Sequence, residues 1–243
     1  MQPEVSGYVL AGGRSSRMGH DKCLLRLGGR TLVEWAVSTL QSCTGDVTVV
    51  GPDVLPGVQA IQDEVPGHGP LGGIEAALSH LGRDWAAFLP VDMPLLPPGL
   101  YAALISDWLS KAETGCHLGF LVVDQLPQPL VSLMHKSTLP FVRGALRAGQ
   151  NKVVPVLKSA GRQIAFDLGL SEEAVLRRIE FTAGEASDLL PWSPAGMEIA
   201  TRHLWFTNCN TPQEFYEAEE VLGLKSRDAT GVASQRDGTG ETR

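Results

Sequence analysis

The segment YVLAGGRSSRMGHDK, residues 8–22, decides the fold class because an apolar run leads directly into a glycine-rich loop. Tyr8–Ala11 is expected to form a short buried strand, and glycines after a first strand let the backbone approach a ligand with its amide hydrogens free. The loop contains three glycines, Gly12, Gly13 and Gly19. Their spacing matches neither the dinucleotide fingerprint G-x-G-x-x-G nor the P-loop pattern, although the same physics applies.

Positive charge distinguishes this loop from an ordinary strand-to-helix turn. It carries three basic residues, Arg14, Arg17 and Lys22. Backbone amides and cations together favour a phosphate group as the ligand. The alternative is a structural turn whose basic side chains are only solvated.

Outward from this loop, apolar runs bounded by turn residues alternate with segments of helical periodicity. The strands expected in the first half are Tyr8–Ala11, Asp46–Val50, Val58–Gln62 and Trp85–Val91. The helices expected there are Thr31–Ser42, Leu71–Leu81 and Pro98–Lys111. This alternation predicts an α/β protein with a mostly parallel sheet covered by helices.

The second half of the chain is less regular. Two strands paired around the turn DQLPQ are expected at Leu118–Val123 and Pro129–His135. Further strands are expected at Gln163–Asp167 and His203–Asn208, and a helix at Leu139–Arg147. The segment 153–157 stays ambiguous because Pro155 lies inside it.

A helix-start signal marks the last element. Thr211 is expected as the N-cap, with Pro212 at the first helical position and Glu214 at the third. Because no internal repeat or clean linker is evident, residues 1–224 are expected to form one domain. Residues 225–243 consist mostly of small, polar and charged residues with little to bury, so we expect a disordered tail.

Composition narrows the class of protein. The 243-residue chain has a formal net charge of −7, which argues against general binding to nucleic acid or to an anionic membrane. No apolar run reaches the roughly 20 residues of a bilayer span, and the N-terminus lacks the pattern of a signal peptide. The four cysteines form no C-x-x-C pair, as expected of reduced thiols. A cytoplasmic enzyme or binding protein is therefore expected.

A single aspartate follows the strand expected at residues 85–91. In FLPVDMPLLPP, Phe88–Pro98, Asp92 lies at the end where open α/β sheets bind ligands. A carboxylate beside a phosphate needs a cation between them, and Mg2+ is usually held by one or two carboxylates together with substrate phosphates. The alternative is that Asp92 only caps the turn. Together with the N-terminal loop, the pattern favours a metal ligand.

Two further loops are candidates for either binding or structure. In QDEVPGHGPLGGIEAAL, residues 62–78, Asp63 follows a strand and three glycines open a helix. This fits either a nucleobase or ribose pocket or an ordinary turn. In TNCNTP, residues 207–212, Asn208 and Asn210 follow the late strand, and capping explains only part of the pattern. A catalytic role and a structural role for these two asparagines both stay open.

Taken together, these motifs resemble those of nucleotidyltransferases, and more narrowly those of the molybdenum cofactor guanylyltransferase family. The motifs that carry the resemblance are LAGGRSSRMGHDK (10–22), GPLGGI (69–74), LPVDMPLLPP (89–98), QPLVSL (128–133) and FTNCNTPQEF (206–215). The resemblance implies a three-layer α/β/α, Rossmann-like nucleotidyltransferase fold. Relatives that use GTP, CTP or UTP share the first and third motifs, so these indicate the reaction more strongly than the base.

The resemblance also implies roles for particular residues. The implied nucleotide-binding residues are Leu10, Ala11, Gly12, Gly13, Lys22, Asp63 and Asp92. The implied catalytic residues are Lys22, Arg17 and Asp92, with Asp92 as the Mg2+ ligand. The implied reaction transfers GMP from Mg-GTP to the phosphate of molybdopterin and releases pyrophosphate. It needs no general base, because the acceptor phosphate is already ionised.

Two departures from the family pattern bear on these roles. Members often have an asparagine after the second strand, where this chain has Gly51-Pro52, so that nucleotide contact is expected to be lost or replaced by a neighbour such as Asp53. Residues 169–204 form an insertion relative to typical members. Within it a helical segment is expected at Glu172–Phe181 and a loop at Pro191–Trp192, on the acceptor side.

Two other functions stay open. One is a different nucleotidyltransferase, which would use CTP or a sugar or alcohol phosphate; the other is a non-catalytic nucleotide- or cofactor-binding protein. Lys22 and Asp92 together favour catalysis, since a pure binder gains little from a carboxylate beside phosphates. The expected partners are GTP and molybdopterin, without nucleic acid or membrane. We expect a monomer that makes transient contacts with cofactor-biosynthesis or acceptor enzymes.

Overall fold

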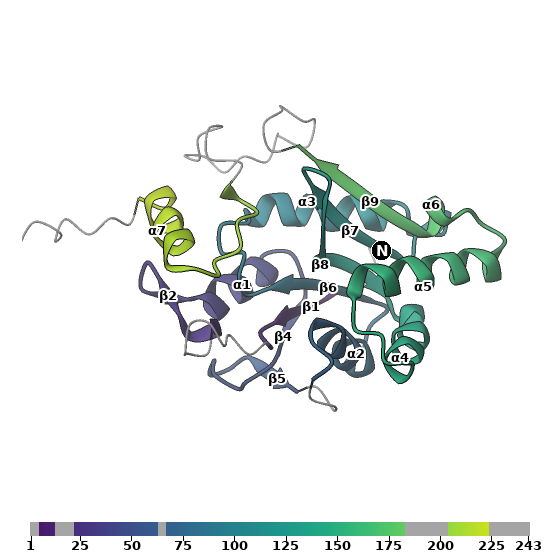
Figure 1. Ribbon diagram of the computed structural model, residues 1–243, viewed down its shortest axis with the longest axis horizontal. Helices are drawn as coiled ribbons and strands as arrows, with labels where there is room; N and C mark the ends of the chain where they lie inside the picture. Colours follow the sequence, from purple (N-terminus) through teal and green to yellow (C-terminus); the bar gives the residue numbers. More distant parts are fainter. Residues whose placement is uncertain (1–4, 13–21, 63–66, 183–203, 224–243) are drawn as a thin grey trace, which may run out of the picture.

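The computed structural model describes residues 5–12, 22–62, 67–182 and 204–223 (Figure 1). Its central sheet has seven strands in the order β5-β4-β1-β6-β8-β7-β9. These strands are β1 (Val5–Leu10), β4 (Asp46–Val50), β5 (Gln59–Ile61), β6 (Trp85–Pro90), β7 (Leu118–Val123), β8 (Leu126–His135) and β9 (Leu176–Phe181). A separate two-stranded hairpin joins β2 (Arg26–Leu27) to β3 (Arg30–Thr31).

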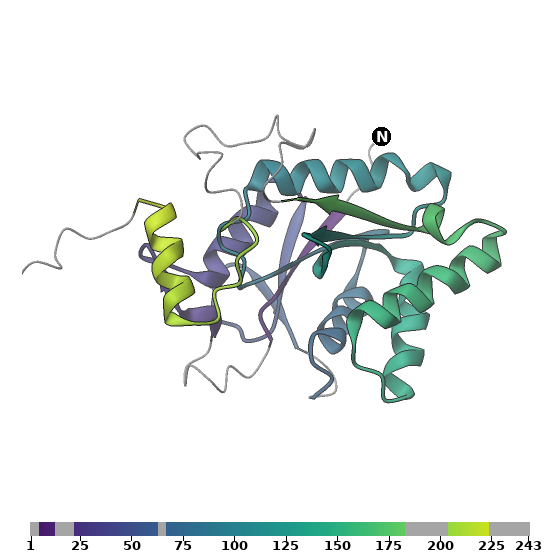
Figure 2. The ribbon, with the colours of Figure 1, turned by 45° about the horizontal axis from the view of Figure 1, so that its top comes forward.

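Helices cover both faces of the sheet. The α-helices of the described part are α1 (Leu32–Gln41), α2 (Pro70–His80), α3 (Pro98–Ser110), α4 (Leu139–Arg147), α5 (Val153–Leu168), α6 (Glu172–Val175) and α7 (Pro212–Val221). Alternate residues of β6 serve the two faces. Ala87 and Leu89 pack with α1 and α3, whereas Ala86 and Phe88 pack with α2 and α5. Figure 2 shows α3 on one side of the sheet and α4 and α5 on the other, which confirms the three-layer arrangement.

The strand order places a ligand-binding crevice beside β1. β8 runs antiparallel to its neighbours β6 and β7, and every other adjacent pair in the sheet is parallel, so the predicted mostly parallel sheet is confirmed. From β1 the chain passes to β4 and β5 on one side and then returns to β6 on the other. Ligands of open α/β sheets bind where the order reverses in this way, outside the carboxyl ends of the strands.

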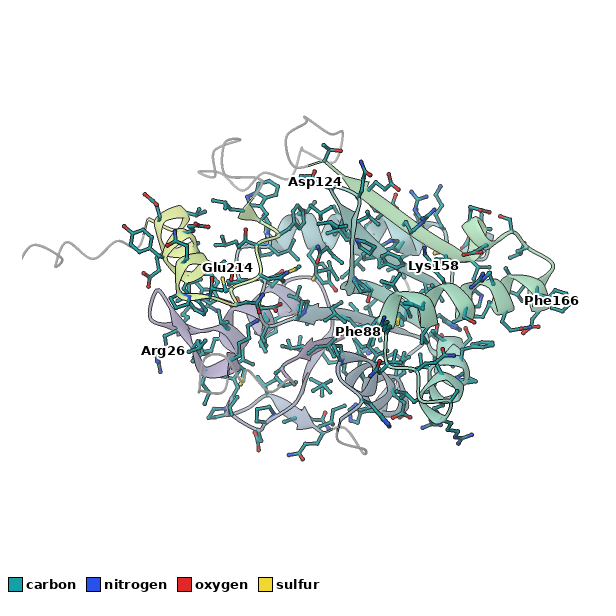
Figure 3. The ribbon with its side chains drawn as sticks, viewed as in Figure 1. Arg26, Phe88, Asp124, Lys158, Phe166 and Glu214 are labelled. Carbon is teal, nitrogen blue, oxygen red and sulfur yellow. The ribbon has the colours of Figure 1, made fainter. Side chains whose placement is uncertain are left out.

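Two strand predictions fail because short apolar runs do not distinguish strand from helix. The predicted strand Gln163–Asp167 lies inside α5, where Val156, Ala160 and Ile164 are buried at helical spacing. Phe166, which the strand reading would have buried, is 81% exposed at the end of this helix (Figure 3). Pro155 belongs to the first turn of α5, where a proline removes no helical hydrogen bond.

The predicted strand His203–Asn208 is also wrong over its described part, because residues 204–208 contain no strand. Trp205 and Phe206 are both buried and both pack on Phe181, with ring centroids 6.5 and 4.8 Å away. Two consecutive residues on one side of the chain are incompatible with the alternation of a strand. The capped helix that follows, α7, begins with Thr211 as predicted.

The insertion contributes an edge strand rather than the predicted helix over residues 172–181. Only Glu172–Val175 is helical, and Leu176–Phe181 forms β9 parallel to β7. Its burial alternates, with Leu176, Ile179 and Phe181 buried and Arg178 and Glu180 exposed. The predicted loop at Pro191–Trp192 and the predicted tail lie outside the described residues. No helix in the described part is long and apolar enough to cross a membrane.

The hairpin between β7 and β8 is tighter than expected. Asp124 and Gln125 have φ of 47° and 66°, as in a two-residue turn with both central residues left-handed. β8 therefore begins at Leu126, three positions before the predicted Pro129. The four helices predicted in residues 31–147 are confirmed to within one residue at each end.

Two histidines contact the same serine hydroxyl near the amino end of β6. The Nδ1 atoms of His117 and His135 lie 2.7 and 2.9 Å from Ser137 Oγ. The Ser137 N–H also donates to His135 Nδ1 at 3.3 Å, so this nitrogen is an acceptor. The hydroxyl then donates to His135 and accepts from His117, an arrangement that requires the His135 ring to be neutral.

We expect the free energy of unfolding to fall as the pH drops below about 6.5. Burial lowers the pKa of both His117 and His135 below the ordinary 6.5, so the folded chain binds fewer protons than the unfolded chain in that range. Urea denaturation at about pH 7.5 and pH 5.5 measures the difference. Replacing both histidines by glutamine should reduce the drop; an equal drop in that variant would assign it to other groups.

Candidate active site

The carboxyl ends of β1 and β6 bring the first and third sequence motifs together. The Val91 amide donates to the Leu10 carbonyl at 3.3 Å, and the Ala11 amide donates to the Val50 carbonyl at 2.9 Å. Leu10, Ala11 and Gly12 therefore stand at the strand end next to the segment that carries Asp92. Of the other predicted site residues, Gly13, Arg17 and Asp63 lie outside the described residues.

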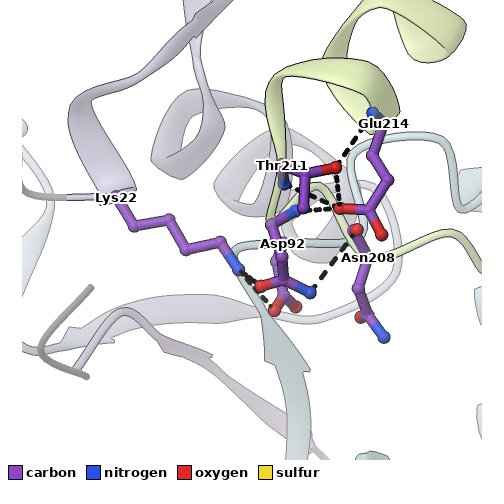
Figure 4. A network of polar contacts seen from close by, with 6 residues as sticks. Lys22, Asp92, Asn208, Thr211 and Glu214 are labelled. Atoms are coloured by element: carbon purple, nitrogen blue, oxygen red, sulfur yellow. Dashed lines mark hydrogen bonds and ion pairs between the residues drawn. The ribbon is translucent and has the colours of Figure 1, made fainter. Parts of the chain in front are cut away.

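Lys22 contacts Asp92 directly. Its Nζ lies 2.7 Å from Asp92 Oδ2, and the two side chains are 17% and 23% exposed. The same ammonium donates to the side-chain oxygen of Asn210. Figure 4 shows Lys22 and Asp92 from close by. Three residues from distant parts of the sequence thus meet at one point, and two of them are the predicted catalytic pair.

The loop before α7 is docked onto this pair. The Cys209 amide donates to the backbone carbonyl of Asp92 at 2.8 Å. Burial, with Asp92 and Glu214 nearby, raises the pKa of the Cys209 thiol to about 12, so this buried cysteine is no nucleophile at neutral pH. The structure places Asn210 in contact with Lys22, while its catalytic role stays a prediction.

Glu214 holds the same loop from the helix side. Its Oε2 accepts hydrogen bonds from the backbone amides of Asn210 and Thr211, each at 2.7 Å, and from the Thr211 hydroxyl at 2.9 Å. Burial disfavours the carboxylate, but these hydrogen bonds and nearby Lys22 leave the pKa of Glu214 below its ordinary value. Glu214 is consequently ionised at neutral pH. The sequence marked it only as a helix-start residue.

Gly51 explains one departure from the family pattern. Its φ is +146°, a conformation that side-chain-bearing residues rarely adopt. A Cβ at this position would lie 3.1 Å from the Ala11 carbonyl carbon and 3.2 Å from the Gly12 amide nitrogen. An asparagine would therefore push against the loop after β1. The neighbouring Asp53 is exposed.

A cavity of about 550 Å³ opens beside Asp92. Its walls are mainly apolar, and prolines contribute at four places, Pro70, Pro90, Pro129 and Pro155. Its other polar residues are Gln128, Asn151, Lys152 and Asn208. Sequence reasoning did not assign Asn151 or Lys152 to a site. Their sequence signal was weak, because they stand in a polar connection before a segment of ambiguous structure.

A bulge in β8 shapes one wall of this cavity. The pairing with β7 jumps from Phe120 with Ser132 to Leu121 with Gln128, which leaves residues 129–131 without partners in that ladder. These residues line the cavity. Pro129 is the first residue of the predicted strand but lies inside β8. A proline inside a strand is typical of such a bulge, since proline cannot donate to a ladder.

Two helix N-termini face the cavity. Pro70 at the start of α2 and Val153 and Val154 at the start of α5 line it, and neither helix has a side-chain cap. Uncapped amides and the positive end of the helix dipole favour an anion there. The cavity therefore combines apolar walls with positive potential at two of its edges.

The site suits a hard divalent cation held by few protein ligands. The described residues contain no group of three or more His, Cys, Asp or Glu side chains placed to hold a metal. Asp92 and Asn210 nevertheless offer oxygen atoms that converge on a positive charge, the ammonium of Lys22. A cation bound through one carboxylate would complete its shell with water and substrate oxygens, as Mg2+ does at phosphate sites.

Known proteins share both the sequence and the fold. A family model described as a MobA-like NTP transferase domain matches residues 7–163. A probable molybdenum cofactor guanylyltransferase from Deinococcus radiodurans is 38% identical over 156 residues, which cover 61% of this chain and 77% of that protein. A molybdenum cofactor guanylyltransferase from Yersinia pestis is 33% identical over 170 residues, covering 67% and 85%.

A solved structure agrees with this fold. Molybdopterin-guanine dinucleotide biosynthesis protein A from Archaeoglobus fulgidus has a TM-score of 0.65 at 22% identity, over 90% of this chain and 98% of that chain. The match to the family model begins within β1, includes Lys22 and Asp92, and ends before α7. By sequence and by fold, the chain belongs to the MobA-like NTP transferase family and groups there with the molybdenum cofactor guanylyltransferases, enzymes of the nucleotidyltransferase class.

Proposed function

We propose that the protein transfers GMP from Mg-GTP to the phosphate of molybdopterin, with release of pyrophosphate. The observation that carries the proposal is the Lys22–Asp92 pair at the carboxyl ends of β1 and β6, next to a cavity with an apolar wall and a positive edge. The related guanylyltransferases named above support the choice of nucleotide and acceptor. The reaction takes place within a single domain, residues 1–224, of a monomeric cytoplasmic enzyme.

In the proposed reaction an oxygen of the acceptor phosphate forms a bond to the α-phosphorus of GTP. The bond from that phosphorus to the bridging oxygen breaks, and its electron pair leaves with pyrophosphate. Lys22 and Arg17, with the amides of Gly12 and Gly13, offset the charge on the leaving group. Asp92 would hold Mg2+, which would supply charge neutralisation to the reacting phosphates. The protein mainly orients the two reactants.

The two substrates occupy different sides of Asp92 in this proposal. The triphosphate lies over the loop after β1, and Asp63 contacts the nucleoside. The acceptor lies in the cavity, where Pro129 and Val153 contact its ring system and Lys152 with the start of α5 binds its phosphate. A planar ring with an anionic end matches a cavity that is apolar on its walls and positive at its edge.

The test is pyrophosphate release with each of the four nucleoside triphosphates, with and without Mg2+ and molybdopterin. Release that requires GTP, Mg2+ and molybdopterin together supports the proposal. Release with CTP or UTP keeps the reaction class but overturns the substrate. A Mg2+-dependent thermal shift with a nucleotide, without any turnover, identifies a binding protein. A nucleotide concentration of about 100 times its Kd should raise the free energy of unfolding by about 2.7 kcal/mol.

Replacing Gly51 by alanine is expected to weaken GTP binding by about tenfold or more. The new Cβ meets Ala11 and Gly12 at 3.1–3.2 Å, and a φ of +146° strains any side chain, so the loop after β1 must shift. Titration calorimetry with GTP measures the effect. Gly57→Ala is a matched control, because Gly57 also has positive φ but its Cβ would meet nothing within 4 Å. Equal losses of GTP affinity in both variants would contradict the prediction.

A further inference from the structure

A chain of hydrogen bonds joins the first turn of α7 to the Lys22–Asp92 pair (Figure 4). Glu214 Oε2 accepts the Asn210 amide at 2.7 Å. The side-chain oxygen of Asn210 accepts from the Lys22 ammonium, which lies 2.7 Å from Asp92 Oδ2. Glu214 is therefore connected to the reacting centre through one residue.

The residue that carries this connection is fixed from both sides. Cys209 before it donates its amide to the Asp92 carbonyl at 2.8 Å. Thr211 after it donates both its amide and its hydroxyl to the same Glu214 oxygen, at 2.7 and 2.9 Å. Asn210 itself is exposed, so packing does not hold it in place. Its position depends on these hydrogen bonds together with those that its backbone amide and side-chain amide donate to the Asn208 carbonyl, at 2.9 and 3.5 Å.

The chain contains the same capping box at a second helix, which separates capping from positioning. At the start of α1, Glu34 Oε2 accepts the Thr31 amide at 2.6 Å and the Thr31 hydroxyl at 2.8 Å. α1 and α7 each have 10 residues. Among the described hydrogen bonds, the Glu34 carboxylate accepts none from the backbone amide of Arg30, the residue before its N-cap, whose guanidinium donates to the Glu34 backbone carbonyl instead. The Glu214 carboxylate has the additional bond from the Asn210 amide. Because Glu34 caps α1 without such a bond, the bond between Glu214 and Asn210 is not needed to cap α7.

We propose that Glu214 is a positioning residue, which holds Asn210 so that its amide oxygen keeps the Lys22 ammonium beside Asp92. The inference rests on the proposed function, in which Lys22 contacts phosphate. An ammonium has three hydrogens. With two directed at Asp92 and Asn210, the third has a fixed direction, and it is the one that reaches a phosphate oxygen. Without Glu214 the ammonium loses this orientation.

The first experiment compares Glu214→Ala with Glu34→Ala. Each variant loses one capping box and should lower Tm by a few degrees. Pyrophosphate release should fall by about 10–100-fold in kcat in Glu214→Ala, with little change in the KM for GTP, and stay near the wild-type rate in Glu34→Ala. Glu214→Gln should restore most of the rate, because glutamine accepts the same hydrogen bonds. Equal rates in the two alanine variants would overturn the inference.

A double-mutant cycle with Lys22→Met separates positioning from a structural effect. If Glu214 acts through Lys22, Glu214→Ala should have almost no further effect on the rate once Lys22 is replaced. A structural defect would lower the rate by the same factor in both backgrounds. An additive cycle therefore contradicts the inference even where Glu214→Ala alone is slow.

A nuclear magnetic resonance measurement makes the inference independent of turnover. In 15N-labelled protein, the ammonium resonance of Lys22, assigned by its loss in Lys22→Met, should be sharp in the wild type and in Glu34→Ala. It should broaden or vanish in Glu214→Ala and Asn210→Ala. If the wild type released no pyrophosphate with any nucleotide, the proposed function would fail, and this resonance would still decide the inference. An unchanged Lys22 resonance in Glu214→Ala would overturn it.

Discussion

Asp92→Asn is expected to lower the rate of pyrophosphate release by about 10²–10³-fold, as found for the loss of one preorganised electrostatic group. The substitution keeps the size of the side chain but removes the negative charge that holds the cation in the proposed function. The backbone carbonyl of Asp92, which accepts the Cys209 amide at 2.8 Å, is unaffected, so the loop before α7 should remain docked. Initial rates of pyrophosphate release at saturating GTP, Mg2+ and molybdopterin measure the change.

The control for this prediction is Asp167→Asn, which removes one exposed carboxylate on α5 that contacts only Gln163 among the described hydrogen bonds. It should leave the rate within a factor of about two. The two variants change the net charge equally, so any difference between their rates belongs to the position. A rate for Asp92→Asn within tenfold of the wild type would show that Asp92 does not hold the metal.

Most of the fold could be predicted because its signals are local. The helix starting at Leu32 has an apolar face at helical spacing and a capping box. The start of α7 is indicated by Thr211, Pro212 and Glu214. Such signals lie within one turn of helix and need no knowledge of the remainder of the chain. The predictions that failed depend on tertiary packing. Trp205 and Phe206 do not alternate as in a strand, because both side chains pack on Phe181 of β9.

The residues of the candidate site also separate into those with local signals and those that depend on tertiary packing. Lys22 and Asp92 have local signals, because each belongs to a recognisable motif that follows a strand. The cavity could not, because it is formed by a bulge at residues 129–131, the start of α5 and the turn after β6, which are separated in the sequence. The role of Asn210 stayed undecided for a similar reason. Its partner Lys22 is 188 residues away, and its own neighbourhood is equally well explained by helix capping.

Lys22→Met is expected to change two measurements in opposite directions. Transfer should slow by about 10²–10³-fold, because in the proposed function Lys22 offsets the charge on the leaving pyrophosphate. Divalent cations should bind more tightly in the absence of nucleotide, because the ammonium 2.7 Å from Asp92 Oδ2 no longer competes for that carboxylate. An ion pair of this exposure is worth about 0.2–1 kcal/mol, which corresponds to a roughly 1.5- to 5-fold lower Kd. Mn2+ titration followed by electron paramagnetic resonance measures this Kd.

Lys136→Met is the control, since it breaks an ion pair of the same length with Asp84, which lies before the amino end of β6, whereas Asp92 follows its carboxyl end. Tighter Mn2+ binding in both variants would reflect net charge alone, whereas tighter binding only in Lys22→Met shows that Lys22 and the metal share Asp92.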